Sequence, residues 1–272
     1  MSLAFESDFF LQFRPFPQVP SNPFEKHWHE IVGSAAFYQL INITAPWINS
    51  LIFGKHYTSI TSKKLKTNFD IHVVSSVQCI ISILLCIPMF SHRFITENPV
   101  FGQTDFGGFV ASVTIGYFIW DLYVCLKHFQ LFGAGFLVHA VSALYVFVTT
   151  LIPYMQPYVP VFLIFELSSP FVNINWYASR LPAGTIPEKV VVINGILLMA
   201  SFFLVRVVWG FYAAIKAFFI CWEVRDQLPA FYIPTVYSLN ITLDFLNLYW
   251  FTKMVQIAVK KAKGTSNPKK LE

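Results

Sequence analysis

The stretch FLVHAVSAL, Phe136 to Leu144, places one histidine, His139, in the middle of an apolar run. Apart from tyrosines, no other residue between His128 and Glu166 carries an acid or a base. The surrounding segment, residues 131–152, has the length and composition of a membrane-spanning helix. A titratable side chain in such a helix is costly, and it indicates either a functional site or a hydrogen bond to a neighbouring helix.

The composition of the whole chain indicates a multi-pass membrane protein. Of its 272 residues, 56% are hydrophobic, 18% aromatic and only 12% charged, whereas soluble domains contain about 25% charged residues. The formal charge of +5 comes from short basic clusters beside apolar segments, so we expect no nucleic-acid partner. The four cysteines lie in apolar segments without a C-x-x-C pair, and we expect buried thiols.

Apolar runs predict an all-α bundle of about seven membrane spans. The expected spans are residues 30–53, 69–90, 107–126, 131–152, 158–177, 188–210 with a helical extension to 222, and 230–255. They divide the chain into an aromatic, proline-rich N-terminal segment (1–29), a first span with a basic loop (30–68), a main helical domain (69–258) and a basic tail (259–272).

The distribution of lysine and arginine predicts the orientation of this bundle. With seven spans, the loop 54–69 and the C-terminal tail, which are the two richest basic clusters, fall on the same side. Positive residues favour the cytosol, so we expect a lumenal N-terminus and a cytosolic C-terminus. The chain ends with Lys269 and Lys270 before two final residues, the form of a retrieval signal read by coat proteins. This predicts the endoplasmic reticulum membrane, with the Golgi as the alternative.

Polar residues inside the predicted spans recur at steps of three and four, which places them on single helix faces directed toward protein. These candidate lipid-binding residues are His72, Ser169, Asn173, Asn240, Asp244 and Asn247, and Arg206 is a seventh candidate. Glu166 shares the face of Ser169, Asp121 lies in the C-terminal half of the third span, and Arg206 is expected near the outer end of the sixth.

The sequence lacks the motifs of several enzyme classes. It contains no glycine-rich phosphate loop, no G-x-S-x-G elbow and no H-E-x-x-H metal helix. No span carries the repeated charges or the broken glycine-rich centre typical of channels and transporters. His27 and His29 form an H-x-H pattern in the proline-rich leader, for which we expect a solvated pair and no metal site.

Six segments together resemble the TLC-domain family, which includes ceramide synthases and translocation-associated membrane proteins. They are FDIHVVSS, GYFIWDLY, FLVHAVSAL, FELSSPFVNINW, FFLVRVVWG and NITLDFLNLYWF. The resemblance covers residues 69–258 and is closest to the plain TLC-domain-containing proteins. It implies six core helices around a membrane cavity, with an additional N-terminal span in this chain.

The chain departs from the synthases at two places. Ceramide synthases carry adjacent histidines where this chain has Val138 and His139, and two aspartates three residues apart where it has Glu166 and Ser169. The resemblance therefore implies only half of the acid and base groups of a synthase.

We expect a protein of lipid homeostasis that binds an acyl lipid in the cavity, with Asp121, His139 and Glu166 as its ionisable core and membrane lipids as its partners. The alternative is an acyl-CoA-dependent N-acyltransferase of sphingolipid metabolism, with His139 as the base and Glu166 or Asp121 as its catalytic partner. Acyl-CoA would then be a substrate, and no cofactor is expected. A scaffold that shelters other membrane proteins is a third hypothesis.

Overall fold

The computed structural model describes residues 7–16, 18–90, 97–152 and 154–263. These residues form helices and turns, and no strand occurs among them. The elements are η2 (Phe9–Phe13), α1 (Pro23–Phe53), α2 (Lys55–Thr58), α3 (Lys63–Phe90), α5 (Asp105–Lys127), α6 (Phe129–Thr149), η3 (Gln156–Tyr158), α7 (Val159–Leu163), η4 (Ile164–Ser168), α8 (Ser169–Arg180), α9 (Glu188–Phe202), η5 (Phe203–Val208), α10 (Trp209–Glu223), η6 (Arg225–Gln227) and α11 (Tyr232–Ala262).

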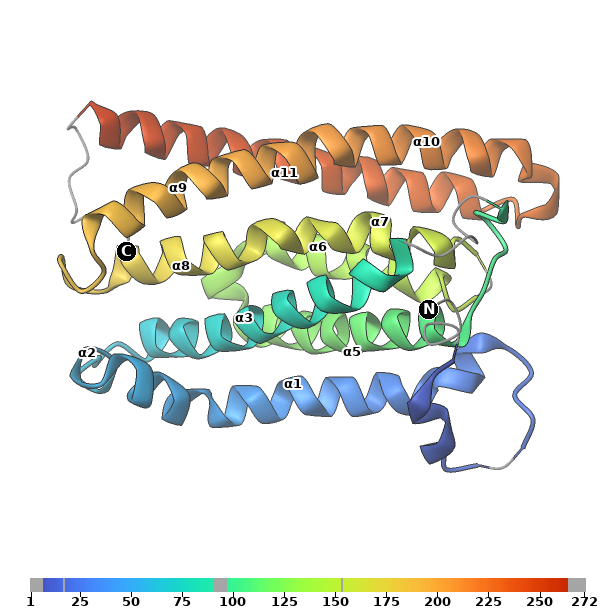
Figure 1. Ribbon diagram of the computed structural model, residues 1–272, viewed down its shortest axis with the longest axis horizontal. Helices are drawn as coiled ribbons and strands as arrows, with labels where there is room; N and C mark the ends of the chain where they lie inside the picture. The colour runs from blue at the N-terminus through green and yellow to red at the C-terminus, as the bar shows by residue number, and fades with distance from the viewer. Residues whose placement is uncertain (1–6, 17, 91–96, 153, 264–272) are drawn as a thin grey trace.

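The long helices lie side by side along the longest axis of the molecule (Figure 1). α1 packs against α5 and α3, α5 against α6, and α3 against α8. α9 and α10 form one continuous rod that packs against α8 and α11, and α11 closes on α6. The predicted all-α bundle is confirmed.

Five segments of the described chain are long and apolar enough to cross a membrane. They are Lys63–Phe90, Asp105–Lys127, Phe129–Thr149, Gln156–Arg180 and Glu188–Glu223. α1 and α11 also run the length of the bundle (Figure 1), but both are interrupted by polar residues such as Asn49 and Asp244, which are buried against neighbouring helices. The multi-pass class is confirmed, and a total of seven spans stays a prediction.

The predicted fifth span is assembled from several short helical pieces. Two 3-10 turns, η3 and η4, alternate with α7 and α8 between Gln156 and Arg180. Proline has no backbone N–H to donate, and Pro157, Pro160 and Pro170 stand at the first positions of three of these pieces. The resulting irregular path places Glu166 and Ser168 on a tight turn in the middle of the bundle.

The sixth predicted span differs more from expectation. The helix from Glu188 to Glu223 runs for 36 residues without a break. Its centre is a π-helical turn, η5, which holds one more residue per turn than an α-helix and often marks functional sites. Arg206 therefore lies in the middle of a long helix, and the prediction that placed it near an outer end is wrong.

The contact between α1 and α5 depends on one glycine. A Cβ at Gly116 would lie 2.5 Å from the Cβ of Ser34 and 2.6 Å from the carbonyl oxygen of Ile31. Such small residues let membrane helices approach closely. The same contact is tied by the Ser34 hydroxyl, which donates to the carbonyl of Val113 at 2.8 Å.

Replacing Gly116 is therefore expected to destabilise the bundle. The added methyl group of Gly116→Ala would push the backbones of α1 and α5 apart, and overpacking of this kind costs about 1–3 kcal/mol. Thermal unfolding in detergent should show a lower midpoint than wild type. Gly33→Ala is the matched control, because Gly33 is a neighbour of Ser34 in α1 and an added Cβ meets nothing within 4 Å. An equal midpoint for the two variants would contradict the proposed close contact.

Candidate intramembrane binding site

A cavity of about 60 Å³ lies inside the bundle between α6, η4, η5 and α11. Its polar wall consists of His139, Glu166, Arg206, Asn240 and Asp244. All five are residues that the sequence singled out, and they come from four separate helical segments. A water molecule occupies about 10–15 Å³ by this kind of measure, so the cavity has room for a few waters or for the polar part of a ligand.

Arg206 is the cation of this wall and is only 9% exposed. Its Nε donates to Ser168 Oγ at 2.9 Å and its Nη2 to Ser169 Oγ at 3.3 Å. The guanidinium also lies over the rings of Phe202 and Phe165, at 5.2 and 5.9 Å from their centroids. Because neutral hydroxyls occupy only some of its five N–H donors, this guanidinium has donors to offer a ligand in the cavity.

His139 is enclosed by aromatic side chains. The centroids of the Trp250 and Phe118 rings lie 5.6 and 6.1 Å from that of the imidazole. The neighbouring Val138 is 41% exposed and lies about 100° further around the helix. Val138 is not among the residues that line the cavity, whereas His139 is.

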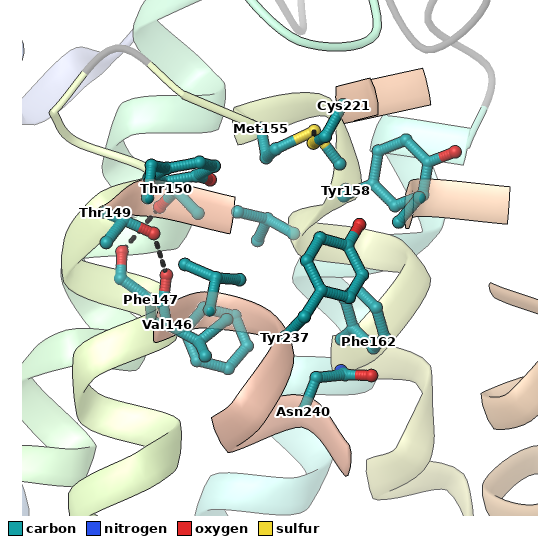
Figure 2. Close-up of a pocket in the computed structure, with 14 residues that line it drawn as sticks. Val146, Phe147, Thr149, Thr150, Met155, Tyr158, Phe162, Cys221, Tyr237 and Asn240 are labelled. Atoms are coloured by element: carbon teal, nitrogen blue, oxygen red, sulfur yellow. Dashed lines mark hydrogen bonds between the residues drawn. The ribbon is translucent and has the colours of Figure 1, made fainter. Parts of the chain in front are cut away.

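Asn240 connects the cavity with two other hollows. It lines a small apolar pocket of about 40 Å³, where it lies below Tyr237 and Phe162 (Figure 2). It also lines a groove of about 490 Å³ between α10 and α11, together with Asp244. The Asn240 Oδ1 atom is buried and has no hydrogen-bond partner in the described chain. An acceptor in the described chain is thus unpaired on a residue that lines all three hollows.

The groove between α10 and α11 is apolar over most of its length. Its walls are Phe211, Ala214, Ile215, Phe218, Phe219, Tyr237, Ile241, Phe245 and Leu248, with Asn240 and Asp244 at its polar part. Four of these side chains, Ile215, Phe219, Ile241 and Phe245, are more than half exposed on the outside of the bundle. Ligand pockets usually measure about 300–1,000 Å³, so this groove has the size of a ligand site with one polar end.

The other predicted site residues lie elsewhere. Ser169 accepts a hydrogen bond from Arg206, as described above. Asn173 exchanges hydrogen bonds with Ser75 of α3 at 3.1 and 3.2 Å. The His72 ring stacks on Trp176 at 3.9 Å, and its Nδ1 contacts the carbonyl of Asn68 at 2.8 Å. His72 of the second predicted span and Asn173 of the fifth therefore join α3 to α8 and do not line the cavity.

Asp121 and Asn247 are also outside the cavity wall. On α5, Asp121 Oδ1 lies 4.0 Å from the thiol of Cys125, and on α11 Asn247 is 3% exposed. All four cysteines are buried and free, as predicted. Lys269 and Lys270 lie outside the described residues.

Two features were absent from the sequence prediction. Ser168 holds Arg206 more closely than the predicted Ser169 does, and only the pairing of η4 with η5 reveals this. The expectation of a solvated His27 and His29 pair is wrong for His27, which is 2% exposed and lies between Asp8 and Glu30. The acid at position 8 is too distant in sequence for a local motif to find it.

Comparison with known proteins identifies the family of this chain. The family model of the TLC domain matches residues 68–256. The chain belongs to the TLC-domain family. This TLC-domain protein is 42% identical over 253 residues to the Topoisomerase I damage affected protein 4 of Saccharomyces cerevisiae, with 92% of this chain and 90% of the relative covered.

Vertebrate relatives are more distant. The TLC domain-containing protein 4-B of Danio rerio is 30% identical over 89% of this chain and 92% of its own length. The TLC domain-containing protein 4 of Homo sapiens is 25% identical over 82% of this chain and 86% of its own length. No solved structure shows a significant match.

Proposed function

We propose that this TLC-domain protein binds an acyl lipid within the membrane and acts in lipid homeostasis without a chemical step. The single observation that carries the proposal is that Asn240 and Asp244 line both the charged cavity and the apolar groove. An acyl chain in the groove would bring the polar part of the same lipid to the cavity.

The residues of the cavity define the chemistry of the polar part. Arg206 donates hydrogen bonds and suits a carbonyl or other oxygen, whereas Glu166 and Asp244 accept them and suit a hydroxyl or amide N–H. A lipid with both acceptors and donors in its polar part, such as an acyl amide or a hydroxylated acyl lipid, matches this wall. Apart from Asp244 at its polar part, the residues that line the groove carry no charge that would oppose the chain.

The basic residues support the orientation that we propose. At one end of the bundle, α2 is located, α3 and α9 begin, and α5, α8 and α11 end (Figure 1). These termini carry Lys55, Lys63, Lys64, Lys66, Lys127, Arg180, Lys189, Lys260, Lys261 and Lys263. At the other end, where α1 and α5 begin and α10 ends, the described chain has Arg14, Lys26 and Arg225, with Lys216 further inside α10. The positive-inside rule assigns the richer end to the cytosol. The C-terminus is then cytosolic, where Lys269 and Lys270 would retain the protein in the endoplasmic reticulum.

The lipid carried through purification tests the proposal. Wild-type protein in a mild detergent should carry an acyl lipid that mass spectrometry identifies, and Glu166→Leu should carry several-fold less because one polar wall of the cavity is lost. Glu223→Leu is the matched control, since Glu223 is exposed at the end of α10 and its loss should leave the lipid unchanged. Equal lipid in wild type and Glu166→Leu would contradict the proposed cavity.

A second candidate function is acyl transfer from acyl-CoA to an amine, and it is favoured by one observation. His139 and Glu166 line the same cavity, so a base and a carboxylate lie together as such a reaction requires. Under our main proposal, purified protein with long-chain acyl-CoA and a sphingoid base forms no amide. Amide formation that disappears in His139→Ala would favour the second candidate instead, and formation that survives would remove His139 as the base.

A further inference from the structure

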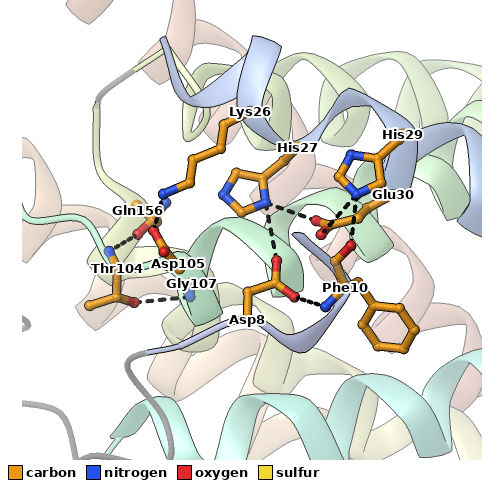
Figure 3. A network of polar contacts seen from close by, with 10 residues as sticks. All are labelled: Asp8, Phe10, Lys26, His27, His29, Glu30, Thr104, Asp105, Gly107 and Gln156. Carbon is orange, nitrogen blue, oxygen red and sulfur yellow. Dashed lines mark hydrogen bonds and ion pairs between the residues drawn. The ribbon is translucent and has the colours of Figure 1, made fainter. Parts of the chain in front are cut away.

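A second group of ionisable side chains lies where the N-terminal segment meets the start of α1, at one end of the bundle (Figure 1). Figure 3 shows this group from close by. Asp8 precedes η2, and His27 and Glu30 lie in the first turns of α1. The His27 Nδ1 atom lies 2.8 Å from Glu30 Oε2 and 3.4 Å from Asp8 Oδ2. One nitrogen thus faces two carboxylates.

These groups are shielded from solvent. The side chains of Asp8, His27 and Glu30 are 0%, 2% and 3% exposed. His27 lies directly on Gly108 of α5, where an added Cβ would collide with its ring. The absence of a side chain at position 108 therefore lets α5 cover the cluster.

The cluster has more acceptors than donors. Asp8 Oδ1 accepts from the backbone N–H of Phe10 at 2.8 Å. Asp8 Oδ2 and Glu30 Oε1 are buried without a hydrogen-bond partner in the described chain, and their ion-pair contacts are long, at 3.4 Å to His27 Nδ1 and 3.6 Å to His29 Nε2. Nδ1 of His27 has at most one proton to share between the two acids. Unpaired buried carboxylate oxygens are costly, so this arrangement is incomplete without a further cationic or donating group.

Charge leads to the same conclusion. Within the three-residue cluster, a positive His27 would balance only one of two ionised carboxylates, and the one further imidazole beside them in the described chain is that of His29, whose Nε2 lies 3.6 Å from Glu30 Oε1. A divalent cation bound to two carboxylates and a neutral imidazole leaves no net charge.

We propose that Asp8, His27 and Glu30 bind a divalent metal ion of the zinc type. The ligand atoms all lie within 4.8 Å of one another. Tetrahedral ligands about 2.0–2.1 Å from Zn²⁺ are about 3.3 Å apart. The 3.4 Å between His27 Nδ1 and Asp8 Oδ2 fits this spacing, whereas the 2.8 Å between His27 Nδ1 and Glu30 Oε2 would have to lengthen when the ion binds. Imidazole and carboxylate together suit zinc, and a water would complete four ligands.

The surroundings provide an approach and a consequence. His27 lines a groove of about 460 Å³ at this end of the bundle, together with Lys26, Asp105 and Gln156. His27 belongs both to this groove and to the cluster, so the groove is the side from which a hydrated ion would approach the cluster. Because Asp8 belongs to the N-terminal segment and the other two ligands to α1, the ion would fasten this segment onto the bundle, where Phe10 already stacks on Phe109 at 5.1 Å.

Metal content tests the proposal. Full-length protein without a polyhistidine tag is stripped with a chelator, dialysed against Zn²⁺ and measured by elemental mass spectrometry and titration. We expect about one zinc per chain. Asp8→Asn keeps the size of the side chain but removes a charged ligand, and the affinity should fall by about 10- to 100-fold or more, since even supporting residues of metal sites contribute that much. Asp226→Asn, an exposed acid of the same end with 86% side-chain exposure, should bind as wild type does.

Wild-type protein that binds no zinc, or Asp8→Asn that binds it with unchanged affinity, would overturn the site. Such a result would indicate that Asp8 and Glu30 share protons with His27 instead. Co²⁺ provides a second measurement that needs no variant. Its visible absorption reports a tetrahedral site with nitrogen and oxygen ligands, and a spectrum of hydrated octahedral Co²⁺ at saturation would equally overturn the proposal.

Discussion

Arg206→Met is expected to abolish most lipid binding while leaving the bundle at least as stable as wild type. Hydrogen bonds from a charged donor contribute about 1.5–3 kcal/mol, so loss of the guanidinium should weaken lipid binding roughly 10- to 100-fold. Stability should not fall in parallel, because the hydrogen-bond partners of Arg206 in the described chain, Ser168 and Ser169, are neutral hydroxyls. Replacing a buried charge by an apolar side chain of similar volume is often neutral or stabilising.

Lipid titration and thermal unfolding of the same preparations measure the two effects. Arg225→Met is the control, because Arg225 is 47% exposed and donates to the carbonyl of Trp222 at the turn between α10 and α11. It should match wild type in both measurements. A large drop in the unfolding midpoint of Arg206→Met with lipid binding intact would show that Arg206 only holds η4 and η5 together.

Asn240→Leu should separate function from stability in the same way, through a neutral group. The Oδ1 atom of Asn240 is buried and has no hydrogen-bond partner among the residues that the structure describes, and an unsatisfied buried polar atom costs about 1–3 kcal/mol. Leucine is similar in size and removes this cost, so the unfolding midpoint of the lipid-free protein should rise. Lipid binding should fall, because the polar group where the groove meets the cavity is gone.

Asn173→Leu provides the contrast for this variant. Asn173 is 4% exposed, but its amide is fully engaged with Ser75 across the contact between α8 and α3. Its replacement should lower the midpoint by the equivalent of about 1–2 kcal/mol without a direct effect on the cavity. If both asparagine variants are destabilised equally, Asn240 is a structural contact and the proposed role of the groove is wrong.

Periodicity explains which parts of the site the sequence predicted. Asn240 and Asp244 are four residues apart and so share one face of α11, and Glu166 and Arg206 carry ionisable groups that are too costly to face lipid. Inward orientation of these residues follows from their own helices and from the membrane, whatever the neighbours are. The inward orientation of these wall residues could therefore be predicted from the sequence.

The sequence could not predict which element packs against each inward face. His72 and Asn173 are as polar as His139 and Asn240, but they lie where α3 meets α8 and pair with nearby residues. Asp121 has the same cost inside the membrane and still lies outside the cavity wall. A helical period reports the face of a residue and says nothing about the element that packs on it.

The sequence by itself thus determined the helical class, the multi-pass character and the inward faces, because composition and a period of 3.6 residues record the difference between lipid and protein surroundings. Only the tertiary structure decided that His139, Glu166, Arg206, Asn240 and Asp244 share one cavity, and that Asp8 reaches His27 and Glu30 from another segment. Both groupings join residues distant in the chain, and their formation depends on how η2, η4 and η5 pack, which no local pattern records.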